Sequence, residues 1–385
     1  MSEQPDKPAP KVLTQRAILI GGIILVVIAV VVTWLLLQLG VGTTQLDAIR
    51  TGGTLVVGAG GAVALLLTAR KQRSTELELR QKHEAHLLAE KIAADNHAHQ
   101  LQVAKDARED ATERRITDLY IKAADQLGSE KAPVRLAGLR ALERLAQGNP
   151  EQRQTIVDVI CAYLRMPSAS DEPQEREVRL TAQRILVTHL SPTDNPDGFW
   201  PDTDLDLSGA VLDDFRLSQC RLRTGFFSRT EFAGTAWFTN VEFTGDAWFT
   251  RAKFGDDAGF ENADFQGRGG FTDIVFAGRA RFGNARFAHT ARFDRTTFGA
   301  TAKFDNASFL KSAGFIDVKF GADAGFSGAR FIRAPRFDGA KFAGPARFDG
   351  TTFASGARFV DVTFTGNPPH EVAEFRPDGA QSSDD

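Results

Sequence analysis

The C-terminal part of the chain, residues 205–366, is governed by a short and regular spacing of apolar side chains. An apolar residue recurs at every fifth position from Leu207 to Phe232, and from there to Phe364 a Phe recurs in alternating steps of six and five. Counted from Phe227, 26 of the 30 phenylalanines follow this schedule. Such regularity predicts one structural position that is filled many times.

The residues around each Phe follow the same schedule. The residue two positions before the Phe is small, most often Ala, and the residue between the two is usually polar. Because residues two apart point to the same side of an extended chain, the small and the large side chain face inward together, and the polar one faces water. Gly, Asp, Asn, Ser or Thr follow most of the phenylalanines, and these residues favour turns. The pattern therefore predicts short extended segments separated by corners.

A five-residue unit of this kind is too short for a hairpin or a crossover connection. The many Gly residues and the scarcity of Leu, Glu and Gln argue against a supercoiled helix with an eleven-residue period. A chain that turns a corner after every unit closes a coil after four units, or about 22 residues, and successive coils pair as parallel strands about 4.8 Å apart. Residues 205–366 are thus predicted to form about seven coils of a β-helix filled by stacked Phe and Ala side chains.

Two apolar runs near the N-terminus predict a membrane anchor. Residues 17–39 carry no charge and are long enough to span a bilayer. Residues 51–69 are shorter and rich in Gly, which lets helices pack closely in lipid; a re-entrant or interfacial segment is the alternative. Lys and Arg flank the pair, with only Arg50 between the runs, so the tail 1–16 and the C-terminus are expected in the cytoplasm. The predicted location is the cytoplasmic (inner) membrane, with a multi-pass topology.

Helical segments are predicted between these runs and the repeat. Residues 70–115 are charged and contain neither Gly nor Pro, which predicts a long helical stalk. The apolar positions do not keep a clean heptad, so a coiled coil is permitted but not required. Four amphipathic stretches in residues 116–190 predict a small helical domain, in which VRLAGLRALERLA resembles the inner helix of a HEAT-type repeat. A turn-rich link, residues 191–204, leads to the repeat, and residues 367–385 form a tail.

The repeat resembles the pentapeptide-repeat family. DLSGA at residues 206–210 and the strings ARFDR, AKFDN and ARFDG match that family's order of a small residue, a polar residue, and then Leu or Phe. The resemblance implies a right-handed quadrilateral β-helix, and the six-residue steps are similar to a Phe-rich branch of the family. With the predicted anchor, the chain resembles bacterial membrane-anchored pentapeptide-repeat proteins. The predicted fold class is multi-domain: two N-terminal transmembrane helices, a stalk, a small all-α domain and a C-terminal β-helix.

No pattern of residues predicts catalysis, a cofactor or a metal, and the chain is predicted not to be an enzyme. A phosphate loop, a nucleophile elbow and paired catalytic carboxylates are all missing from the sequence. Cys161 and Cys220 make neither a disulfide framework nor a metal motif. The stalk histidines are expected on a solvated surface, the aspartates that follow Phe are expected at turns, and one His is isolated in the repeat. These residues are His83, His86, His97 and His99, then Asp294, Asp305, Asp338 and Asp349, and finally His289.

The net charge of the repeat favours some classes of binding partner over others. The whole chain has a net charge of −3, whereas residues 203–366 hold 21 Lys and Arg against 19 Asp and Glu, a net charge of +2. The best-known relatives bind DNA gyrase as DNA mimics, which requires a strongly negative rod, so this alternative is disfavoured. Anionic lipid or RNA is a further alternative for the outward basic residues, although interleaved Asp residues favour a neutralised surface. The basic residues in question are Arg281, Arg292, Lys303, Arg336, Arg347 and Arg358.

The remaining prediction is a non-catalytic scaffold, anchored in the membrane, that presents its rod to an unidentified protein partner. Because unpaired strand edges must be covered, the helical domain is expected to cap the first coil. The tail 367–385 or a second copy of the rod is expected to cover the last coil. Homo-oligomers are permitted through the stalk or the rod end, and nucleic acid is not expected as a partner.

Overall fold

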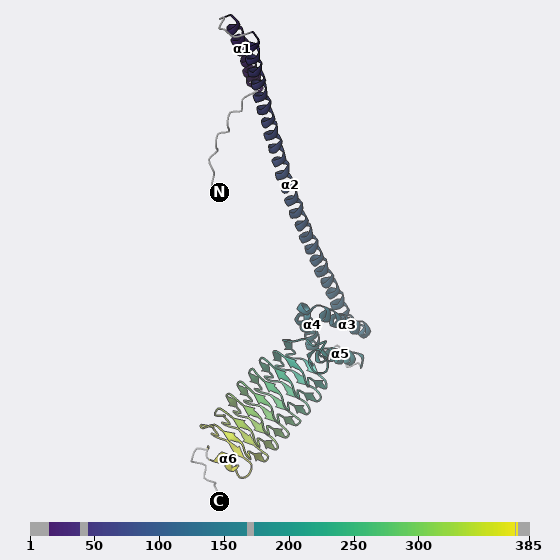
Figure 1. The fold of residues 1–385 in the computed structure, drawn as a ribbon. Helices are drawn as coiled ribbons and strands as arrows, with labels where there is room; N and C mark the ends of the chain where they lie inside the picture. The colour runs from purple at the N-terminus through teal and green to yellow at the C-terminus, as the bar shows by residue number, and fades with distance from the viewer. Residues whose placement is uncertain (1–14, 39–44, 168–172, 374, 376–385) are drawn as a thin grey trace. The chain divides into compact units, whose positions relative to one another are not determined.

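The computed structural model describes residues 15–38, 45–167, 173–373 and 375 (Figure 1). Nearly all of the predicted N-terminal tail 1–16, and residues 376–385 of the predicted C-terminal tail, lie outside the described residues. The chain divides into two compact units, one up to Glu109 and one from Asp110 onward.

The N-terminal unit is helical. It contains α1 (Gln15–Gln38) and most of α2 (Gln45–Leu127). Among the residues that the structure describes, no helix combines the length and the apolar run needed to cross a membrane. This finding contradicts the predicted transmembrane helices 17–39 and 51–69 and the predicted multi-pass location in the inner membrane. The second predicted span is not a helix of its own, because residues 51–69 open the 83-residue helix α2, which is charged along most of its length.

The predicted stalk, residues 70–115, lies within α2, whose lack of Gly and Pro beyond residue 69 keeps one helix continuous. The apolar side chains of this segment are exposed. Its surface also carries ion pairs between residues one helical turn apart, such as Lys105 with Glu109 at 3.7 Å. The structure therefore gives no support to a coiled coil here. The exposed apolar residues are Leu77, Leu79, Leu87, Leu88, Ile92, Leu101 and Val103.

The second unit begins with a compact helical cap. It consists of α3 (Ala132–Gly148), the short 3-10 turn η1 (Pro150–Gln152), α4 (Arg153–Arg165) and α5 (Pro173–Leu190), which pack on the end of α2. Apolar residues at helical spacing meet in its centre, with fully buried side chains at Leu139, Leu142, Ile156, Ile160 and Ala182. The predicted amphipathic stretches therefore bury their apolar faces against one another.

Gly138 sets the distance between α3 and α2. A Cβ atom at this position would lie 2.8 Å from the backbone oxygen of Ala123 and 2.8 Å from the backbone nitrogen of Leu127. We expect Gly138→Ala to lower the free energy of unfolding by about 1–3 kcal/mol, because backbone rather than a flexible side chain must move. Gly148→Ala is the matched control, since that position has free space, and urea denaturation measures both. Equal stability of the two variants would contradict this prediction.

The rest of the second unit is a four-sided β-solenoid (Figure 1), and the predicted β-helix of about seven coils is confirmed. The coils contribute strands in turn to four parallel sheets, so the first and third sheets lie on opposite sides of the core. In the last coils, isolated bridges at Arg336 and Arg358 continue the first sheet. We call the sheets faces 1 to 4 in chain order. Face 1 contains β1 (Leu205–Asp206), β5 (Gly225–Phe226), β9 (Ala247–Trp248), β13 (Gly269–Gly270), β17 (Ala291–Arg292) and β21 (Ala313–Gly314). Face 2 contains β2 (Val211–Leu212), β6 (Glu231–Phe232), β10 (Lys253–Phe254), β14 (Val275–Phe276), β18 (Thr297–Phe298), β22 (Lys319–Phe320), β25 (Lys341–Phe342) and β28 (Thr363–Phe364).

The other two faces complete each coil. Face 3 contains β3 (Phe215–Arg216), β7 (Ala236–Trp237), β11 (Ala258–Gly259), β15 (Ala280–Arg281), β19 (Ala302–Lys303), β23 (Ala324–Gly325) and β26 (Ala346–Arg347). Face 4 contains β4 (Arg221–Leu222), β8 (Glu242–Phe243), β12 (Asp264–Phe265), β16 (Arg286–Phe287), β20 (Ser308–Phe309), β24 (Arg330–Phe331) and β27 (Thr352–Phe353).

The alternating five- and six-residue steps correspond to two kinds of corner. Lys253 pairs with Val275, and Ala258 pairs with Ala280, so one full coil takes the predicted 22 residues. The five-residue corners, from face 1 to face 2 and from face 3 to face 4, each contain a residue with positive φ, such as Arg251 or Asn262. A residue in the left-handed backbone conformation turns the chain sharply, here onto the next face. The six-residue corners reach the next face with one extra residue instead.

Phenylalanine rings fill the interior in four columns. Rings in successive coils stack with centroids 4.5 Å apart for Phe232 and Phe254, and up to 5.5 Å apart for Phe331 and Phe353. Rings from opposite faces meet edge to face, as Phe249 does with Phe260 at 88°. Both geometries are favourable for aromatic rings, so the columns support one another across the core.

Segments outside the strands contact both ends of the solenoid. At the first coil, α4 packs against β1 and β2, and the Gln154 side chain both donates to and accepts from the backbone of Asp204. Arg165 forms an ion pair with Asp206 beside it. At the last coil, the Phe375 ring lies 5.4 Å from the Phe353 ring, next to the short helix α6 (His370–Ala373). The helix α4 therefore covers the strand edges of the first coil, which would otherwise be open to pairing. At the last coil the contacts cover part of the core, where Phe353 and Phe364 are only partly buried.

Candidate binding surface on the solenoid

The sides are the largest accessible surface of the solenoid, because Phe rings fill the core and α4 covers the first coil. The sides are not uniform. Residues 203–264 hold 6 Lys and Arg against 11 Asp and Glu, a net charge of −5. Residues 265–366 hold 15 against 8, a net charge of +7. The near-neutral total thus conceals an acidic half next to the helical cap and a basic half beyond it.

The structure divides the six predicted basic residues between two opposite faces. Arg292, Arg336 and Arg358 lie on face 1, where Arg336 and Arg358 both contact the carboxylate of Asp338, at 3.0 and 3.3 Å. That part of face 1 is therefore partly neutralised, as the interleaved Asp residues indicate. The other three residues, Arg281, Lys303 and Arg347, form one column on face 3.

A groove of about 400 Å³ lies along this column on face 3. Arg281, Lys303, Gly325 and Arg347 occupy the same outward position in four successive coils. Gly325 has no side chain, so the column is interrupted between Lys303 and Arg347. Polar side chains from the neighbouring corners complete the lining: Arg279, Thr301, Asp305, Asp323 and Ser327.

Two tryptophans extend the outward surface in a way that the sequence interpretation missed. The Trp237 ring lies over Gly259 in the next coil, where a Cβ atom would approach it to 2.5 Å, and it meets the Arg281 guanidinium at 5.3 Å. On face 1, Trp248 lies over Gly270 in the same manner. A Trp in the polar column followed 22 residues later by Gly was the signal that could have revealed this packing.

The aspartates that follow Phe stabilise the coils. Asp294 and Asp305 each accept a hydrogen bond from a backbone N–H of the next coil, from Ile316 and Ser327 respectively, both at 3.1 Å. Asp338 accepts from Val360 at 3.4 Å. These carboxylates are therefore engaged with the backbone, in addition to lying at the predicted turns.

The histidines of the stalk and of the repeat are exposed to solvent. His83, His86, His97 and His99 are exposed on α2, and His289 is exposed at a corner of the solenoid. His86 contacts a neighbouring carboxylate in the same helix, Glu90, at 3.3 Å. In the part of the chain that the structure describes, no three His, Cys, Asp or Glu side chains gather as metal ligands would.

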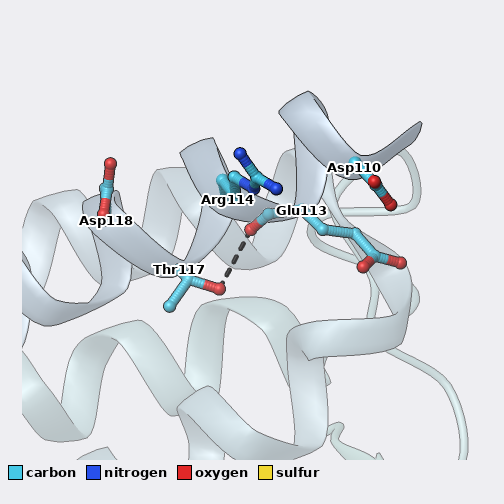
Figure 2. Close-up of a pocket in the computed structure, with 5 residues that line it drawn as sticks. All are labelled: Asp110, Glu113, Arg114, Thr117 and Asp118. Atoms are coloured by element: carbon cyan, nitrogen blue, oxygen red, sulfur yellow. Dashed lines mark hydrogen bonds between the residues drawn. The ribbon is translucent and has the colours of Figure 1, made fainter. Parts of the chain in front are cut away.

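A second hollow, of about 330 Å³, lies beside α2 (Figure 2). Its lining residues are exposed, and the Thr117 hydroxyl donates its hydrogen bond to the backbone oxygen of Glu113 within the same helix. The remaining lining residues are Asp110, Arg114 and Asp118. These side chains are solvated and are not held in a fixed arrangement by buried neighbours, so we do not propose a binding site here.

Both cysteines are expected to be unreactive in the folded protein. Burial raises the pKa of the Cys161 thiol, and likewise that of the Cys220 thiol, from 9.0 to about 12. A thiol-specific reagent at mildly alkaline pH should modify neither residue in the native chain and both after denaturation, which mass spectrometry would count. Because the folded pKa is the higher one, the contribution of each thiol to stability is present below about pH 9 and declines as pH rises toward 12. Rapid native labelling would contradict this prediction.

The comparison with known families agrees with this architecture. The family model for pentapeptide repeats (9 copies) matches residues 207–253 and 326–367, which are the two ends of the solenoid. The chain carries pentapeptide repeats. No curated protein and no solved structure matches it. Pentapeptide-repeat β-solenoids are typically non-catalytic, and the family is often involved in protein interaction.

Proposed function

We propose that this pentapeptide-repeat chain is a non-catalytic interaction scaffold that binds a protein partner along the sides of its solenoid. The filled core and the capped first coil carry this proposal, because they leave the lateral faces as the main accessible surface of a rigid rod. Stacked rings and interstrand hydrogen bonds make such a surface preorganised, and a preorganised surface binds without an ordering cost.

The uneven charge supports a protein partner. An acidic half and a basic half along one rod suit a partner with the complementary distribution, and such complementarity sets the orientation of a complex. A DNA mimic would instead need negative charge along the whole rod, and residues 265–366 carry a net charge of +7. We therefore do not expect gyrase inhibition.

Site-specific photo-cross-linking in cells tests the scaffold. In the full-length chain, a photoreactive phenylalanine analogue replaces one exposed residue on each face of the solenoid. The positions on faces 1 to 4 are Phe226, Val275, Lys303 and Arg330, and Leu87 in α2 is the control. We expect a discrete adduct with another protein from one or two faces of the solenoid, and none from α2. Adducts that link only copies of this chain, or none from any face, would overturn the proposal.

A further inference from the structure

The face-3 groove is lined by cationic side chains that can bind an anion, independently of the scaffold role. Its floor exists because Gly325 leaves a gap in a column of long cationic side chains. Successive coils are about 4.8 Å apart, so Lys303 and Arg347, two coils apart, emerge about 10 Å from each other across this gap. An occupant can therefore lie between the two cations.

The cationic side chains that line the groove differ in whether a carboxylate pairs with them. Arg279 and Arg281 both contact the Asp257 carboxylate, at 2.7 and 2.8 Å. Arg347 contacts Asp323 at 3.6 Å. Within the residues that the structure describes, Lys303 makes no ion pair of 4.0 Å or less, although it stands in the middle of the column. The Asp305 carboxylate nearby accepts the backbone N–H of Ser327 and lies over Gly325.

We propose that this groove binds a compact anion with several phosphate groups, held between Lys303 and Arg347. Arginine guanidinium groups bind phosphate oxygens in pairs, and a lysine supplies a mobile point charge. The hydroxyl groups of Thr301 and Ser327 line the same groove and can donate to further oxygens. The backbones of Lys303 and Arg347 are about 10 Å apart, a span that a chain of three phosphates matches better than a single phosphate does.

Two carboxylates oppose such a ligand: Asp305, which lies over Gly325, and Asp323, from which the anion must take Arg347. Binding is therefore expected to be moderate and to weaken as salt is added. On a merely basic surface the loss of any nearby carboxylate would tighten anion binding equally, whereas at this site the loss of Asp323 should have the larger effect. Removing the charge of Asp323 frees Arg347 for the ligand and should tighten binding.

Calorimetric titration of the full-length protein with tripolyphosphate at low salt tests the site. We expect saturable binding. Affinity should fall about tenfold in Lys303→Gln, because one hydrogen bond to a charged group is lost, and it should rise in Asp323→Asn. Inorganic phosphate should bind more weakly than tripolyphosphate. The matched controls are Lys319→Gln, an exposed face-2 lysine, and Asp317→Asn at the preceding corner, which make the same charge changes away from the groove. Both controls should leave the affinity unchanged.

Three results would overturn the site. One is the absence of saturable binding in the wild-type chain. Another is an equal loss in Lys303→Gln and Lys319→Gln, which would reduce the effect to the net charge of the rod. The last is binding of a single-stranded oligonucleotide without binding of tripolyphosphate. Because the titration uses no protein partner, its failure would leave the scaffold proposal standing, and failed cross-linking would leave the anion site standing.

Discussion

Phe282→Ala should destabilise the solenoid by about 3–5 kcal/mol. The Phe282 ring is fully buried and stacks between Phe260 and Phe304, with centroids at 4.6 and 4.8 Å. It also meets Phe271 and Phe293 edge to face, at 5.5 and 5.4 Å. Removing it leaves a cavity that neighbouring coils cannot collapse into, because their backbones are held in register by hydrogen bonds on both sides.

Phe364→Ala is the matched control for this substitution. It belongs to an equivalent column but lies in the last coil, is only partly buried, and has Phe342 on one side at 4.8 Å. In a solenoid, each coil is stabilised mainly by its nearest neighbours, so the terminal residue should cost clearly less than the central one. Denaturation in urea, followed by circular dichroism, measures the difference. Equal costs would show that the stacked columns do not behave as a ladder of neighbours.

The second large effect is expected at Trp200, in the link between the helical cap and the first coil. Its buried indole stacks on the His189 ring at 4.0 Å and donates a hydrogen bond to Gln147 at 2.9 Å. Its backbone N–H donates to the His189 carbonyl, and its own carbonyl accepts from the Thr203 hydroxyl. Trp200→Ala should therefore cost about 3–5 kcal/mol and loosen the cap from the solenoid.

Hydrogen exchange locates this effect, because the amides of α5 and of the first coil should lose protection together while the central coils keep theirs. Trp200→Phe keeps the ring stacking but loses the N–H donor, and it should cost only about 1 kcal/mol beyond the change in ring volume. A stability loss in Trp200→Ala that left the exchange of α5 unchanged would argue against a role for Trp200 in joining the two parts.

The sequence could predict most of the solenoid but little of its surface. The Phe positions follow one schedule because every coil repeats the same interior, so spacing alone predicts the stacked columns. The outward positions obey no such rule. Whether Arg336 is neutralised, or Lys303 finds no ion pair among the described residues, depends on carboxylates in neighbouring coils and corners, and these side chains meet only after the chain has closed.

The N-terminal segment shows the opposite case. Apolar runs at residues 17–39 and 51–69 predicted two membrane spans, yet in the described residues no helix meets the requirement for crossing a membrane, and the second run belongs to a helix that ends at Leu127. Composition in a short window gives no information on where a helix ends. Helix boundaries depend on the residues beyond the window, and here they lack Gly and Pro up to the cap.

By itself, then, the sequence determined the repeat, the coil length and the filling of the core, because these follow from periodicity and side-chain volume. Only the tertiary structure decided which corner is tight, how α4 covers the first coil, how Phe375 contacts the last coil, and where Gly325 opens a groove among cations. The physical reason is that a buried column repeats the same neighbour contact in every coil, whereas each surface site arises from residues about 22 positions apart that the fold alone brings together.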